Sequence, residues 1–102
     1  MPEQNNFYAK FCKIGKTKIK EAFEKNDWTS SKASWTDFEL TNNWSELILE
    51  GDENEPLLNG MVAFHPNNLK LLDEIFYALD GQYAYEFCDK EKNLIFEKKS
   101  AS

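Results

Sequence analysis

The stretch "WSELILEGDENEPLLNG" (residues 44–60) places two apolar segments on either side of a short acidic loop. Before the loop, Ser45, Leu47 and Leu49 fall on one side of an alternating pattern, which is typical of a half-buried strand. The other side holds Trp44, Glu46, Ile48 and Glu50. A glycine and a proline bracket the loop and indicate a turn. The stretch therefore predicts a β-hairpin. It also raises the question of what neutralises the three acidic side chains of the loop, because the stretch contains no basic residue.

Further strands are predicted on both sides of this hairpin. Residues 34–40 ("SWTDFEL") alternate in the same way, and "TNN" separates them from the strand at 44–50. The second strand of the hairpin, 57–65, is mostly apolar and suits the middle of a sheet, with Gly60 marking a bulge. Residues 82–89 and 94–99 flank a polar turn and predict a C-terminal hairpin, whereas residues 26–34 have the composition of a loop.

Two helices are expected from the 3.6-residue period. At 100° per residue, the apolar side chains of residues 7–25 fall on one half of a helical wheel. We therefore predict one helix there, with Gly15 inside it. The alternative is a break at Gly15, giving a strand over 7–14 and a short helix capped by Thr17. A second helix is predicted up to residue 79, with Pro66 near its start and Asn68 as its N-cap.

The predicted order of elements is α-β-β-β-α-β-β. Short connections favour antiparallel neighbours, and each helix has one apolar side that it must bury. The sequence thus predicts an α+β fold, an antiparallel sheet of about five strands with two helices packed on one face. At 102 residues the chain is expected to form a single globular domain over 1–102, with flexible ends at 1–5 and 99–102.

Composition and charge restrict the partners. The net charge is −6, and all twelve basic residues are lysines. Without arginine, the chain lacks the planar groups that contact phosphates and bases in pairs, and the negative charge disfavours direct binding of nucleic acid. We find no apolar run of the ~20 residues that a membrane span requires and no signal-peptide pattern. We therefore expect a cytoplasmic protein that does not bind membranes.

The charge is distributed unevenly along the chain. Residues 33–69 contain seven acidic residues and no lysine, whereas residues 1–32 carry a net charge of +3. The acidic residues fall on two adjacent strands and their loop, so like charges are expected within a few ångströms of each other on one sheet face. One interpretation is an ordinary solvated face, screened by lysines of the N-terminal helix. The other is a docking surface for a basic partner, with tryptophans as anchors. Its predicted contact residues are Trp35, Asp37, Glu39, Trp44, Glu46, Glu50, Asp52, Glu53 and Glu55.

Signs of catalysis are weak. His65 is the only histidine, and nothing in its spacing from Cys12 or Cys88 indicates a nucleophile with its base. One histidine and two distant cysteines make a poor zinc site, and no phosphate-binding or dinucleotide-binding motif is present. We expect no enzyme activity, no cofactor, no metal, and two reduced cysteines.

In size, charge and helix–strand content, the chain resembles the small acidic immunity proteins that neutralise bacterial toxins, including toxins of contact-dependent inhibition systems. The resemblance implies a bacterial inhibitor whose partner is a basic toxin or nuclease domain. Two alternatives remain open. One is a phage-encoded DNA mimic that inhibits a defence nuclease; the other is a structural or adaptor subunit that pairs with itself through a sheet edge or a helix.

Overall fold

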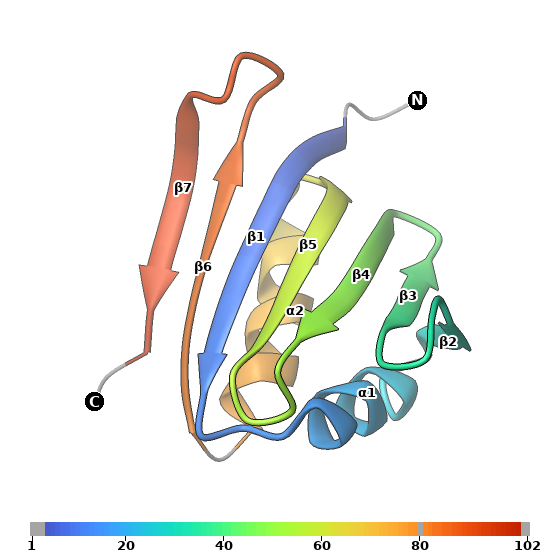
Figure 1. Cartoon of the computed structure of the whole chain (residues 1–102). Helices are drawn as coiled ribbons and strands as arrows, with labels where there is room; N and C mark the ends of the chain where they lie inside the picture. Colours follow the sequence, from blue (N-terminus) through green and yellow to red (C-terminus); the bar gives the residue numbers. More distant parts are fainter. Residues whose placement is uncertain (1–3, 80, 101–102) are drawn as a thin grey trace.

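The fold is α+β, but its sheet has seven strands instead of about five. The computed structural model describes residues 4–79 and 81–100. The order of elements is β-α-β-β-β-β-α-β-β, so the predicted order is wrong at its start (Figure 1). The elements are β1 (Gln4–Cys12), α1 (Lys16–Glu24), β2 (Thr29–Lys32), β3 (Phe38–Asn42), β4 (Ser45–Gly51), β5 (Pro56–Ala63), α2 (Pro66–Tyr77), β6 (Gln82–Cys88) and β7 (Leu94–Lys99).

The first correction concerns the N-terminal segment, which is a strand followed by a short helix. Phe7, Ala9 and Phe11 are buried, whereas Tyr8 and Lys10 between them are exposed. This is the alternation of a strand, so the single-helix prediction for 7–25 is wrong and the alternative was closer. The short helix is not capped by Thr17, because α1 begins after Gly15.

The second correction concerns residues 26–37. The predicted loop contains β2, a four-residue polar strand that pairs with β3, and the predicted strand at 34–40 begins only at Phe38. Residues 33–37 form the turn between β2 and β3. Strand β2 has no buried residue, and its four residues are all polar. Its sequence therefore lacks the apolar alternation by which a strand is recognised.

The strands form one antiparallel sheet in the order β2-β3-β4-β5-β1-β6-β7. Gly60 lies opposite Phe7 on one side and Leu47 on the other, in a continuous register without a bulge. Its φ is +154°, and a Cβ placed there would stand 2.1 Å from the Glu46 carbonyl oxygen. The glycine therefore permits close approach of β4, and the irregularity lies instead between Phe87 and Cys88 of β6.

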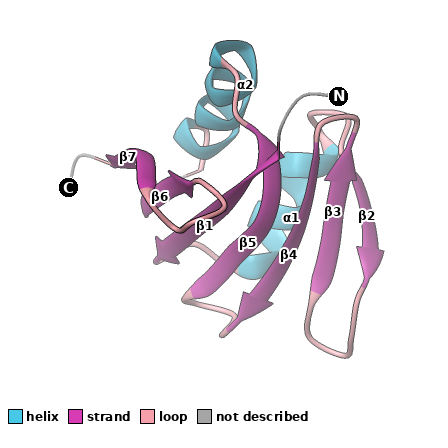
Figure 2. Cartoon of the chain, turned by 90° about the horizontal axis from the view of Figure 1, so that it is seen from above, coloured by secondary structure: helices cyan, strands magenta, loops and turns pink. Residues whose placement is uncertain are grey.

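Both helices cover the same face of the sheet, as predicted (Figure 2). Phe76 of α2 lies 5.4 Å from Phe11 of β1 and 6.0 Å from Phe23 of α1, measured between ring centroids. The covered face and the helices thus share one aromatic core. We call the opposite, helix-free side of the sheet the open face.

The ends of the chain are only partly described. Gln4 and Asn5 belong to β1 and Lys99 is the last residue of β7, so these three positions of the predicted flexible ends are in strands, and Ser100 directly follows β7. The remaining predicted end residues 1–3, 101 and 102 lie outside the described residues.

Candidate acidic interface

Three carboxylates of β3 and β4 lie on the open face. Glu39 and Glu46 are exposed, and Glu50 is half-buried. The register places an uncharged residue directly across from each: Ile48 faces Glu39, Thr41 and Met61 flank Glu46, and Leu57 faces Glu50. The carboxylates of this half of the sheet are therefore staggered, and none lies directly opposite another.

These three carboxylates have no cationic partner among residues 4–79 and 81–100, where no lysine forms an ion pair with them. Glu50 accepts a hydrogen bond of 2.7 Å from the amide of Asn59, which fixes its position without neutralising it. The helices, and with them the backbone that carries the lysines of α1, lie on the other side of the sheet (Figure 2). Lys20, for example, pairs with Glu24 of its own helix.

Apolar side chains lie between these carboxylates and the middle of the sheet. Tyr8 is 45 % exposed and Leu57 is 40 % exposed, and Ile48 and Met61 are half-buried. The register sets Ile48, Asn59 and Tyr8 in one row across β4, β5 and β1. This half of the open face therefore combines an apolar centre with an acidic border, the usual composition of a protein-binding surface.

The Asp37 carboxylate, unlike the three on the open face, is paired with a lysine. Lys16, at the start of α1, is 2 % exposed, and its Nζ lies 3.6 Å from Asp37 Oδ1. The same Nζ donates hydrogen bonds to the carbonyl oxygens of Thr36 (2.8 Å) and Gly51 (2.6 Å). The buried ammonium thus joins the β2–β3 turn to the end of β4. A helical wheel of residues 7–25 puts Lys16 among its polar positions, and only the tertiary structure reveals this contact.

Glu53 also has an internal partner. Its Oε1 accepts hydrogen bonds from the backbone N–H and the hydroxyl of Thr17, each at 3.4 Å, and its carbonyl oxygen accepts one from Lys16 N–H at 3.0 Å. Gly15, the N-cap of α1, has no side chain with which to cap the helix. The acidic loop supplies this cap, with favourable charge at the helix N-terminus. Asp52 and Glu55 of the same loop remain exposed.

The two predicted tryptophan anchors have different surroundings. Trp35 is 91 % exposed at the β2–β3 turn, with Lys32 Nζ 5.6 Å from its ring. Trp44 is partly buried on the helix side, where its ring packs edge-on against Trp28 at 5.2 Å. Trp44 is therefore separated from the carboxylates of the open face, although the alternation of 44–50 placed it among them.

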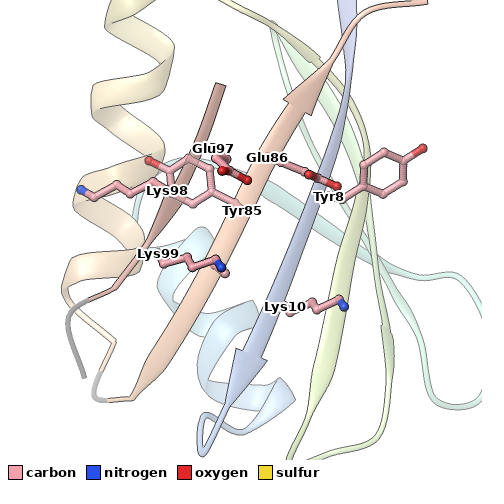
Figure 3. A pocket seen from close by; sticks show the side chains of 8 residues that line it. Tyr8, Lys10, Tyr85, Glu86, Glu97, Lys98 and Lys99 are labelled. Carbon is pink, nitrogen blue, oxygen red and sulfur yellow. The ribbon is translucent and has the colours of Figure 1, made fainter. Parts of the chain in front are cut away.

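The other half of the open face carries charges that sequence analysis did not assign to a site. Glu86 of β6 lies directly opposite Glu97 of β7. Figure 3 shows both carboxylates, with Lys99 and Lys10 further along the strands; these residues and Tyr8 line a hollow of about 200 Å³. The alternation of these charged residues with apolar ones is visible in the sequence. Which of them are neighbours follows only from the register of the strands.

A polar cluster joins β6 and β7 to α2 on the helix side. Asp73 Oδ1 accepts hydrogen bonds from Lys98 Nζ (2.6 Å) and from the Tyr85 hydroxyl (3.2 Å). Burial, with the charge of Asp73, raises the pKa of Tyr85, and the hydrogen bond to Asp73 raises the pKa of Lys98. Both groups are protonated at neutral pH. The cluster therefore stabilises the contact of α2 with β6 and β7 through hydrogen bonds to Asp73.

The remaining chemistry-bearing residues have structural surroundings. His65 is the N-cap of α2, and its Nδ1 accepts a hydrogen bond from Asn67 N–H; Asn68, the predicted cap, instead donates to the Ala63 carbonyl. Cys12 and Cys88 are free thiols, and roughly 20 Å of strand separates their register positions. Burial raises the pKa of Cys88. Within the described residues, no group of three or more His, Cys, Asp or Glu side chains is placed to hold a metal ion.

No family model, curated protein or solved structure matches this chain. None of the helices among the described residues has the length and apolar character needed to cross a membrane.

Proposed function

We propose that this chain is a small protein-binding inhibitor of the toxin-immunity kind, and that it docks a basic toxin or nuclease domain on its open face. The observation that carries the proposal is the uncompensated negative charge of Glu39, Glu46 and Glu50 beside exposed apolar side chains. Such a surface attracts a positive partner over distance and then buries apolar area on contact.

The proposed contact set is smaller than the one predicted from sequence. Asp37 and Glu53 hold the fold together, and Trp44 packs against Trp28. The remaining residues face solvent and form the proposed interface, with Trp35 as its exposed aromatic anchor. The interface comprises Trp35, Glu39, Glu46, Glu50, Asp52 and Glu55.

Carboxylates on this surface would occupy the partner's phosphate-binding positions or a basic surface next to them. In either arrangement the partner's cationic groups exchange hydration for protein carboxylates, so binding weakens as salt screens the charges. The proposal places the protein in the cytoplasm, where free thiols such as Cys12 and Cys88 persist.

Affinity capture from the native host, read by mass spectrometry at low and high salt, tests the proposal. The test variant replaces Glu39, Glu46 and Glu50 by glutamine. The control variant replaces Glu21, Glu74 and Glu91, which are exposed elsewhere, and changes the net charge equally. We expect the wild type and the control to retain a basic protein in a salt-sensitive manner, and the test variant to bind it at least about tenfold more weakly. Equal retention by both variants would contradict the proposal.

A further inference from the structure

Strand β7 is an edge of the sheet with free backbone groups. Ser100 N–H donates to the Tyr83 carbonyl oxygen at 2.8 Å, and Ala84 is paired with Lys99. Hydrogen-bonded and non-hydrogen-bonded positions alternate along an antiparallel pair. The N–H and C=O groups of Lys99 and Glu97 therefore point away from β6, towards the open edge.

The side chains of this edge strand include exposed apolar groups and a carboxylate without an ion-pair partner among the described residues. Leu94 is 53 % exposed and Ile95 is 42 % exposed at the beginning of the strand, outside residues 97–99, which the pairing below joins. Glu97 lies opposite Glu86 at a non-hydrogen-bonded position, where side chains of neighbouring strands are closest and like charges repel. Neither carboxylate forms an ion pair with a lysine in the described part of the chain. The other edge strand, β2, is four polar residues long and exposes no large apolar side chain.

We infer that β7 pairs antiparallel with β7 of a second copy of this chain, with Glu97 opposite Lys99 of the partner subunit. The geometry of the free edge limits the possible registers. Only residues whose backbone groups point outwards can form hydrogen-bonded pairs, so Glu97 pairs with another odd-numbered residue. This parity also makes the open faces of the two copies continuous.

Charge selects one register among these. Pairing Glu97 with its own copy would bring a further carboxylate beside the Glu86–Glu97 pair. Pairing Glu97 with Lys99 instead forms two symmetric ion pairs and gives each Glu97 a cation. The two Lys98 side chains then meet at the centre, but each is held by Asp73 at 2.6 Å on the helix side. The self-pairing thus relieves a repulsion that the single chain leaves in place.

Sedimentation of the full chain tests this inference, with circular dichroism to confirm that each variant is folded. The interface is small, so we expect a reversible dimer with a dissociation constant between about 10 µM and about 1 mM. Glu97→Lys and Lys99→Glu should each weaken the dimer about tenfold or more, and the two substitutions together should restore it. Glu39→Lys, an equal charge change on the other half of the open face, serves as the control and should leave dimerisation unchanged.

A backbone variant tests the hydrogen bonds of the pairing. Its matched control is Lys99→Gln, which removes the charge but keeps the N–H and should retain more dimer than Lys99→Pro. Lys99→Pro removes an outward N–H and leaves the N–H groups that point to β6, and proline is tolerated on edge strands. We expect this variant to be folded and monomeric. A monomeric wild type throughout the concentration range would overturn the inference. A dimer that survives Lys99→Pro, or that the double charge swap does not restore, would also overturn it. The inference does not depend on the proposed inhibitor function.

Discussion

Lys16 neutralises one of the seven acidic residues in the middle of the sequence, Asp37. Its ammonium is buried between two backbone carbonyl oxygens and Asp37, although a lysine in an amphipathic pattern is normally assigned to solvent. No local pattern distinguishes Lys16 from Lys13 or Lys18, because its partners are about twenty and thirty-five residues away. The sequence left open whether lysines of the N-terminal helix screen the acidic residues. The two with internal partners, Asp37 and Glu53, were recognisable only from the tertiary contacts.

Replacing Lys16 by methionine should destabilise the fold strongly. The substitution leaves the Thr36 and Gly51 carbonyl oxygens and the Asp37 carboxylate without their donor, so we expect the free energy of unfolding to fall by about 3 kcal/mol. Urea denaturation measures this change. Lys18→Met, a change at an exposed lysine of the same helix, should cost less than about 0.5 kcal/mol. Equal losses for the two variants would show that the buried contacts of Lys16 do not stabilise the fold.

At the scale of elements, the error at β1 came from a pattern that fits two periods. Phe7 and Phe11 are four residues apart, a spacing that lies on one side of both a helix and a strand. The buried Ala9 and exposed Tyr8 decide for the strand, but neither residue does so alone. Strands β4, β5, β6 and β7 were predicted close to their observed bounds because clear turns separate them. Strand β2 was missed because its pairing with β3 is its main contact.

The β6–β7 hairpin should depend on pH through its turn. Asp89 Oδ1 accepts hydrogen bonds from the N–H groups of Asn93 and Glu91, each at 2.9 Å, and these bonds lower the pKa of Asp89. Because the pKa is lowered in the folded state, the stabilisation is present above the unfolded value of about 4 and is lost as the pH falls through the folded value.

Amide hydrogen exchange of β7 as a function of pH, corrected for the intrinsic exchange rate, measures this dependence. We expect protection to decrease below about pH 4 in the wild type. In Asp89→Asn the amide oxygen still accepts hydrogen bonds but does not titrate in this range, so this contribution to the decrease should be absent. An identical pH dependence in the two proteins would contradict the role given to the Asp89 carboxylate.

At the scale of the whole molecule, the sheet separates the charges. Both helices lie on one face, and no lysine of α1 forms an ion pair with the carboxylates of β3 and β4 on the other face within the described residues. The α+β class and the covered face were predictable because each helix shows a clear apolar side. The number of strands and the side of the sheet on which Trp44 lies were not predictable, because they depend on strand register and on the conformation of a turn. The acidic half of the open face thus follows from the fold, although its residues were identified from sequence.

The most direct test of the central claim is the footprint of the captured basic partner on this chain, measured by amide NMR of the isotopically labelled protein. We predict that resonance changes centre on the outward residues of β3, β4 and β5 and on the loop of Asp52 and Glu55, and that they weaken with added salt. Changes confined to α2 and the Trp28–Trp44 contact, on the helix side, would contradict the assignment of the open face as the binding surface.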